Sequence, residues 1–225
     1  MSMAQEMIHE ILPVGLLQCN CSVVGDPETR EAIVIDPGDE VECILEIIAR
    51  HDLKVRLILN THAHIDHVGG LHAMRQATGA PVLMHPDDLE LYRRLEIQAS
   101  WLGMRVPEMV EVDGALREGD VVRWGRHQAR VMHTPGHTRG SVCLYVPANA
   151  APGRSPEPGT LFAGDTLFAG GIGRTDLWGG SFEDILRSIE NKLLALPDDT
   201  LVYPGHGEPT TIGQERELNP FLRFR

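Results

Sequence analysis

Short runs of apolar and β-branched residues recur along the chain and predict strands. They cover residues 8–17, 20–24, 32–35, 55–59, 81–84, 110–112, 121–124, 127–132, 161–164 and 201–203. Between some of these runs, apolar residues recur every three to four positions, which predicts amphipathic helices over residues 40–51, 71–78, 87–100 and 182–196. Strands, then alternating helices and strands, then strands again indicate an α/β chain.

The length of 225 residues suits one large α/β domain with a substantial core. The Pro/Gly-rich stretch 147–159 is too short to separate two domains, and we interpret it as an exposed hairpin loop. We therefore expect a single domain over residues 1–225. The net charge of −12 argues against nucleic acid or an anionic membrane surface as the main partner. An anionic small-molecule substrate would need a local basic group.

Cysteine spacing and hydropathy predict a cytoplasmic protein. The four cysteines form neither a Cys-x-x-Cys motif nor a disulfide framework: Cys19, Cys21, Cys43 and Cys143. Residues 1–18 lack a basic start followed by a long apolar run, so we expect no signal peptide. No segment contains eighteen consecutive apolar residues, so we expect no membrane span.

Four candidate metal ligands follow the apolar run 55–59, in the order His-x-His-x-Asp-His: His62, His64, Asp66 and His67. In an extended segment, residues two apart point the same way, so His62 and His64 can face one point. Asp66 and His67 are adjacent and diverge, so they more easily serve a second point. Asp66 could also cap the helix that begins near Leu71. Imidazole and carboxylate together suit Zn²⁺, Fe²⁺ or Mn²⁺.

Three later β-prone runs each end in a turn with one further ligand directly after glycine: His137, Asp165 and His206. Seven ligands are too many for one tetrahedral zinc, but they suit two metals roughly 3.5–4 Å apart with a shared carboxylate. Asp165 is the natural bridge, because a carboxylate has two oxygens. Metal one then takes His62, His64 and His137, and metal two takes Asp66, His67 and His206. Asp66 and Asp165 are the candidate catalytic carboxylates, with a metal-activated water as the nucleophile.

Two other polar residues close apolar runs. Asp36 follows the run 32–35 and is either a turn-forming residue or a support for a metal ligand. His85 follows the run 81–84, and because no partner motif surrounds it we do not expect it to be a ligand. The apolar stretch 101–104 fits ordinary packing or a lid over a substrate.

The ligand order His-x-His-x-Asp-His, His, Asp, His resembles the metallo-β-lactamase superfamily over nearly the whole chain. The resemblance implies an α/β fold: a four-layer αββα sandwich with the metals at one edge of the two sheets. It also implies that Asp36 supports a metal ligand from behind, and that the cofactors are two divalent metal ions, with zinc favoured and iron or manganese allowed.

Within that superfamily, four segments resemble the glyoxalase II-like hydrolases: Thr-His-Ala-His-Ile-Asp-His-Val-Gly-Gly, Thr-Pro-Gly-His-Thr, Phe-Ala-Gly-Asp-Thr-Leu-Phe and Gly-Ile-Gly-Arg-Thr-Asp. The resemblance implies hydrolysis of glutathione thioesters, mainly S-lactoylglutathione. It implies that Arg174 meets a substrate carboxylate. Full glyoxalase II enzymes carry a C-terminal helical domain, whereas 19 residues follow His206 here. The hypothesis of thioester hydrolysis is therefore better supported than the hypothesis of tight glutathione binding.

Other activities share the fold. Persulfide dioxygenases use one iron and oxygen and also carry a Gly-x-Gly-Arg-Thr-Asp stretch. Lactonases and β-lactamases share the metal site, although one β-lactamase subclass has Cys where this chain has Asp165. A metal-bearing binding module without turnover is disfavoured, because a structural site has no use for an open water position.

Overall fold

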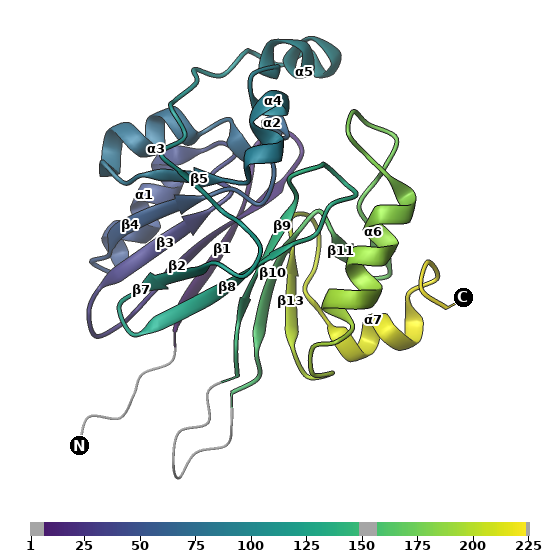
Figure 1. The fold of residues 1–225 in the computed structure, drawn as a ribbon. Helices are drawn as coiled ribbons and strands as arrows, with labels where there is room; N and C mark the ends of the chain where they lie inside the picture. The colour runs from purple at the N-terminus through teal and green to yellow at the C-terminus, as the bar shows by residue number, and fades with distance from the viewer. Residues whose placement is uncertain (1–6, 149–156, 224–225) are drawn as a thin grey trace, which may run out of the picture. The chain divides into compact units, whose positions relative to one another are not determined.

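The computed structural model describes residues 7–148 and 157–223 (Figure 1). Its contacts divide the chain into two compact units. Unit 1 takes the chain up to residue 84 together with residues 89–115 and 123–128, and unit 2 takes residues 85–88, 116–122 and the chain from 129 onward. The single domain expected over residues 1–225 stays a prediction.

Unit 1 is built on a six-stranded sheet in the order β1-β2-β3-β4-β5-β6. The strands are β1 (Ile8–Val14), β2 (Cys19–Gly25), β3 (Glu31–Ile35), β4 (Lys54–Leu59), β5 (Val82–Met84) and β6 (Gly114–Ala115). The first three pair antiparallel, and β3 to β6 pair parallel. The helices are α1 (Val41–Arg50), α2 (Ile65–Val68), α3 (Leu71–Thr78), α4 (Leu89–Tyr92) and α5 (Leu95–Leu102).

The core of unit 1 joins α1 and α3 to the strands, and both helices lie beside the sheet in Figure 1. Ile44 of α1 and Leu71 of α3 are fully buried in one cluster with Val23 and Val34. Because β3 and β4 are parallel, the residues that follow them emerge at the same edge of the sheet. Asp36 follows β3 there, and the His-x-His-x-Asp-His segment follows β4.

Unit 2 is built on a sheet in the order β14-β13-β10-β9-β8-β7. The strands are β7 (Val121–Trp124), β8 (His127–His133), β9 (Val142–Val146), β10 (Thr160–Gly164), β13 (Leu201–Pro204) and β14 (Thr210–Thr211), beside a hairpin of β11 (Leu167–Phe168) and β12 (Gly171–Ile172). Residues 123–128, at the turn between β7 and β8, count with unit 1. The helices are η1 (Pro86–Asp88), α6 (Phe182–Ser188), η2 (Ile189–Leu193) and α7 (Ile212–Leu218).

Strand directions in unit 2 bring three chain segments to one edge. β8 and β10 both pair antiparallel with β9, so they run the same way, and β13 pairs parallel with β10. The three strands therefore end on the same side of the sheet, and each is followed by one predicted ligand. The core beneath them gathers Ile185 and Leu186 of α6 and Ile212 of α7 against Leu161 and Val202.

Two expected elements differ from the structure. The helix expected over 87–100 is broken between α4 and α5, because the Leu91 carbonyl accepts hydrogen bonds from the Arg94 amide (3.0 Å) and the Gln98 side chain (3.2 Å). The strand expected over 110–112 does not form. The Tyr92 hydroxyl bonds both the Val110 amide (3.1 Å) and the Val110 carbonyl (3.3 Å), so this main chain pairs with a side chain.

The other helices and strands expected from the sequence agree with the structure apart from local details. The helix expected over 182–196 is helical as α6, and then widens to i→i+5 hydrogen bonding in η2. Most of the loop expected over 147–159 lies outside the described residues. Among the residues that are described, no helix combines the length and the apolar character that crossing a membrane requires.

Candidate metal centre

The first group of predicted ligands, His62, His64, Asp66 and His67, lies in unit 1 directly after β4. The ring centroids of His62 and His64 are 4.9 Å apart, and those of His62 and His67 are 4.0 Å apart. His64 has extended backbone, as expected, whereas Asp66 and His67 lie in the short helix α2. The expectation that Asp66 caps the next helix was wrong, because Asp66 lies inside α2 and Gly70 is the N-cap residue of α3.

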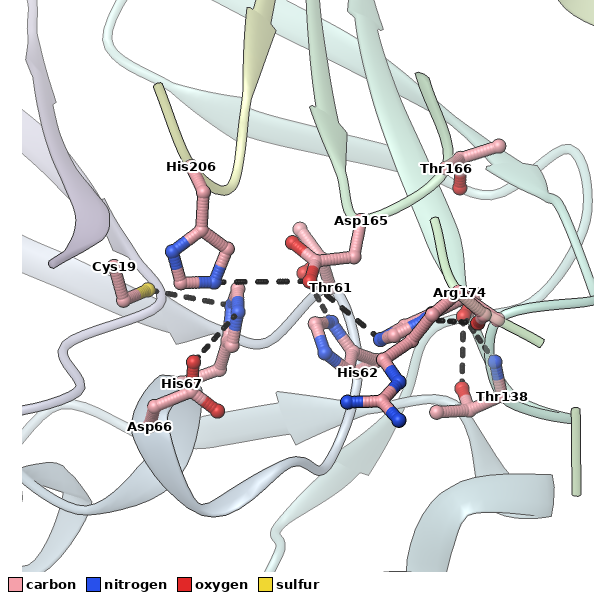
Figure 2. A network of polar contacts seen from close by, with 12 residues as sticks. Cys19, Thr61, His62, Asp66, His67, Thr138, Asp165, Thr166, Arg174 and His206 are labelled. Atoms are coloured by element: carbon pink, nitrogen blue, oxygen red, sulfur yellow. Dashed lines mark hydrogen bonds and ion pairs between the residues drawn. The ribbon is translucent and has the colours of Figure 1, made fainter. Parts of the chain in front are cut away.

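Asp36 orients His67 from behind. Its carboxylate accepts hydrogen bonds from the Thr61 amide (2.7 Å), the Thr61 hydroxyl (2.6 Å) and His67 Nδ1 (3.0 Å). Both Asp36 and His67 are buried. A carboxylate can only accept here, so His67 Nδ1 carries the proton and its Nε2 carries the lone pair that a metal would use. That Nε2 atom lies 3.7 Å from an Asp66 carboxylate oxygen (Figure 2).

The same network fixes the tautomer of His62. The Thr61 hydroxyl donates its proton to Asp36, so it can only accept from His62 Nδ1, at 3.1 Å. This places the lone pair of His62 on Nε2 as well. Asp36 therefore fixes the tautomers of two imidazoles: that of His67 directly, and that of His62 through the Thr61 hydroxyl.

Two side chains that no sequence pattern marked also contact this group. Gln98 of α5 accepts from the Ile65 amide (2.9 Å) and donates to the Ala63 carbonyl (3.1 Å), so it fixes the main chain on both sides of His64. Cys19 Sγ lies 3.4 Å from His67 Nδ1. Burial raises the pKa of the Cys19 thiol to about 12, so the sulfur stays protonated at neutral pH.

The second group of predicted ligands, His137, Asp165 and His206, lies in unit 2 at the ends of β8, β10 and β13. The backbone before His137 requires glycine, since Gly136 has φ +143°, and the backbone before Asp165 favours it, since Gly164 has φ +49°. A Cβ on Gly136 would also stand 2.2 Å from the Ile185 amide nitrogen.

Asp165 stands between two imidazoles. One of its carboxylate oxygens, Oδ2, lies 3.5 Å from His137 Nε2 and 3.7 Å from His206 Nε2, as Figure 2 shows for His206. These separations are long for hydrogen bonds. They are close to the ligand-to-ligand distance of about 3.4 Å that a tetrahedral ion with bonds of about 2.1 Å imposes. His137 Nδ1 donates to the Arg174 carbonyl (2.7 Å), so its Nε2 also carries the lone pair.

Gly173 allows the main chain before Arg174 to pack closely against Asp165 and His137. A Cβ at Gly173 would lie 1.8 Å from the Asp165 carbonyl oxygen and 3.2 Å from the His137 Cβ. The chain must therefore have glycine here for Arg174 to bring its carbonyl to His137. In the segment Gly-Ile-Gly-Arg-Thr-Asp, only the arginine was expected to have a role in the site. The structure shows that Gly173, directly before it, is also needed for the close approach.

The Arg174 side chain points into solvent and is already paired. Its Nε and a terminal nitrogen each donate to an Asp176 carboxylate oxygen at 2.8 Å. The side chain is 61% exposed. This forked bond raises the pKa of Arg174 and lowers that of Asp176 to about 2, so both groups are charged at neutral pH. A substrate carboxylate would have to replace Asp176 on the fork.

His85 lies in a separate group in unit 2 with Asp87 and His133, whose ligand atoms are within 4.8 Å of one another. The His85 and His133 rings are stacked, with centroids 3.9 Å apart and planes 10° apart. Ring nitrogens carry their lone pairs in the ring plane, so stacked rings direct them side by side and not at a common ion. Burial lowers the pKa of His85 to about 4. That His85 is not a ligand stays a prediction.

Comparison with known proteins decides the family. The model of the metallo-beta-lactamase superfamily matches residues 14–206. The chain belongs to the metallo-beta-lactamase superfamily. The α/β fold class expected from the resemblance is thereby confirmed.

Superfamily members with related sequences carry several activities. The chain is 37% identical to the hydroxyacylglutathione hydrolase GloC of Haemophilus influenzae, over 96% of this chain and 98% of that protein. The structure of BLEG-1, a B3 metallo-beta-lactamase, matches with TM-score 0.85 and 36% identity over 96% of this chain and all of that one. TTHA1623, solved in a di-iron-bound form, matches with TM-score 0.82 and 38% identity over 95% of this chain and all of that one.

Proposed function

We propose that this superfamily member is a binuclear-metal hydrolase that cleaves thioesters of the S-lactoylglutathione type. Two lines of support converge. A relative with 37% identity over nearly the full length of both chains is named a hydroxyacylglutathione hydrolase. The motifs that resemble glyoxalase II-like hydrolases also include six of the seven proposed ligands, and the seventh, His206, lies between Gly205 and Gly207.

The donor set fits two divalent metals. We assign His62, His64 and His137 to one metal, Asp66, His67 and His206 to the other, and Asp165 to both. The observation that carries this assignment is the Asp165 carboxylate oxygen, which lies 3.5 and 3.7 Å from the Nε2 atoms of His137 and His206. The mixed imidazole and carboxylate donors suit zinc, iron and manganese. A di-iron form of a protein with 38% identity agrees with two metals per chain.

When bound, the metals would supply an acidified water and polarise the thioester carbonyl. The residues of the chain prepare that chemistry. Asp36 keeps the Nε2 lone pairs of His67 and His62 available through fixed tautomers, and the Arg174 carbonyl does the same for His137. Asp66 and Asp165 would supply two negative charges that partly offset the charge of two divalent cations. Cys19 is no nucleophile, since burial raises its pKa to about 12 and keeps it a thiol.

Arg174 is the proposed substrate cation. The chain is acidic overall, so an anionic thioester needs a local positive group. The guanidinium fork matches a carboxylate and already holds one from Asp176. An exposed pair of this kind contributes little to stability, because water and salt screen it. A substrate carboxylate can therefore exchange with Asp176 at little cost.

The test compares three reactions on the purified chain. Zinc- or manganese-loaded protein is given S-lactoylglutathione without oxygen, iron-loaded protein is given glutathione persulfide with an oxygen electrode, and zinc-loaded protein is given a chromogenic cephalosporin. We expect rapid anaerobic thioester cleavage with little oxygen uptake. Rapid oxygen uptake with negligible thioester cleavage would assign the chain to the dioxygenases. The likeness to BLEG-1 is the reason for including the cephalosporin. Preferred cleavage of the cephalosporin would assign the chain to the β-lactamases.

A further inference from the structure

A buried carboxylate on α7 lies outside both ligand groups and is held only by neutral donors. Glu215 is 1% exposed. Its carboxylate oxygens accept hydrogen bonds from the Thr210 hydroxyl (2.6 Å), the Gly170 amide (2.9 Å) and the Asn219 side-chain amide (2.8 Å). In the described part of the chain, no lysine, arginine or histidine pairs with it. Burying a carboxylate without a cation costs free energy, and its hydrogen bonds must compensate for the lost hydration.

Those hydrogen bonds fix the tip of the β11–β12 hairpin. The Gly170 amide lies in the turn of the hairpin, where Gly170 has φ +70°. The fully buried Asn219 side chain donates both to Glu215 and to the Gly171 carbonyl (3.0 Å). Glu215 and Asn219 therefore hold one amide and one carbonyl of the hairpin tip from the same helix end.

The two ends of this hairpin lead directly to the ligands of unit 2. Asp165 precedes β11, and Gly173 and Arg174 follow β12. The Gly173 amide bonds the Thr166 carbonyl (3.4 Å), which closes the base of the hairpin. From there Gly173 packs on the Asp165 main chain and the Arg174 carbonyl accepts from His137 Nδ1. A displaced hairpin would move Asp165 and release the proton-bearing side of His137.

We propose that Glu215 and Asn219 are positioning residues that hold the β11–β12 hairpin and, through it, fix Asp165 and His137 for metal binding. The kinetic part of this inference rests on the proposed thioester hydrolase, but the structural part does not. It assigns to the C-terminal helix a role in the metal centre, although none of its side chains is among the proposed ligands.

The experiment compares Glu215→Gln with two control variants of α7. A glutamine offers one oxygen and one NH₂ group, so it cannot accept from all three donors. Glu217→Gln makes the same chemical change at an exposed position of the helix. Ile212→Val removes one methylene from the buried side of α7 and none of the hydrogen bonds to the hairpin tip, and so loosens the helix by packing alone. Each zinc-loaded variant is measured for thermal stability, hydrogen exchange of the amides in 167–172, zinc release to a chelator, and thioester kinetics.

We expect Glu215→Gln to speed both the hydrogen exchange of the hairpin amides and the release of zinc by at least about tenfold. A change of this size corresponds to the loss of one hydrogen bond to a charged group. Glu217→Gln and Ile212→Val should stay within about twofold of the parent chain in both rates, even where Ile212→Val lowers the thermal midpoint. Asn219→Ser, whose side chain is too short to reach the Gly171 carbonyl, should repeat the effect of Glu215→Gln and serves as the second variant if Glu215→Gln does not fold.

Equal zinc release from Glu215→Gln and Ile212→Val at matched thermal stability would overturn the proposal, because Glu215 would then only stabilise the fold. If the parent chain cleaves no thioester while Glu215→Gln still releases zinc faster than Ile212→Val, the proposed function fails and the positioning role stands.

Discussion

The two groups of proposed ligands are held in different ways. In unit 1, side chains support the ligands: Asp36 and Thr61 set the tautomers, and Gln98 fixes the main chain around His64. In unit 2, main-chain groups contact them directly. The Arg174 carbonyl fixes the tautomer of His137, and Gly173, which has no Cβ, lets its main chain lie against that of Asp165. In direct contact with the proposed ligands, carboxylate and amide side chains give the support in unit 1, and glycine and carbonyl groups give it in unit 2.

This difference predicts different weak points. The group in unit 1 should be sensitive to substitutions that keep shape but change a donor into an acceptor, or the reverse. The group in unit 2 should be sensitive to an added methyl group where its main chain packs closely, and to a donor-for-acceptor change only where that change loosens the hairpin held by Glu215 and Asn219. Substitutions of a ligand itself should have the largest effect in either unit, and substitutions that touch only the substrate should have the smallest.

Asp165→Asn should have the largest effect. The amide keeps the shape but loses the charge and the second anionic oxygen that a bridging ligand needs. We expect a loss of at least about 100-fold in kcat, in line with the weight of charge stabilisation at metal sites. Steady-state kinetics with S-lactoylglutathione, together with metal analysis, measure it. Full metal occupancy with retained turnover would show that Asp165 does not bridge.

Asp36→Asn should weaken metal binding without removing a ligand. Asparagine tolerates the left-handed backbone of Asp36, at φ +51°, so the loop keeps its path. Its NH₂ group cannot accept from Thr61 or His67, so the imidazole orientation is lost. Losses of this kind cost about 10–100-fold in metal affinity. Chelator competition measures the affinity, with the exposed Asp39→Asn as the matched control. An unchanged affinity would mean that Asp36 only shapes the turn.

Gly173→Ala tests the support by main chain in unit 2. The new methyl group would lie 1.8 Å from the Asp165 carbonyl oxygen, so the backbone must shift. Overpacking of this kind costs roughly 1–3 kcal/mol, and we expect about a tenfold loss of kcat with weaker zinc retention. Gly171→Ala, whose methyl group would meet only Phe168 Cβ at 3.8 Å, is the control on the same hairpin. Equal effects of the two alanines would show that the close approach at Gly173 is not what matters.

Arg174→Ala should have the smallest effect, and only on substrate binding. Because Asp176 competes for the guanidinium, we expect KM for S-lactoylglutathione to rise by only about 3–10-fold, near the upper range for an exposed pair, with kcat and metal content unchanged. A neutral acyl-ethanethiol thioester should show no change in KM. The same loss on both substrates would rule out carboxylate recognition as the role of Arg174.

The pattern of the chain predicted what depends on neighbours in sequence. Apolar runs predicted β3, β4, β10 and β13, and the glycines before His137 and Asp165 proved to have backbone that favours glycine. Contacts between distant residues were not predictable. Gln98 reaches Ile65 across 33 residues, and Glu215 reaches Gly170 across 45. No local periodicity marks such partners, and the strand expected near Val110 failed because the hydroxyl of Tyr92 bonds its main chain.

Metal stoichiometry tests the central claim most directly, since the account requires both ligand groups to act together on two ions. The metal-free chain is titrated with zinc, freed of excess ion, and analysed for bound metal per chain. The account predicts a plateau of two zinc ions per chain. A plateau of one, unchanged at excess zinc, would contradict the binuclear centre.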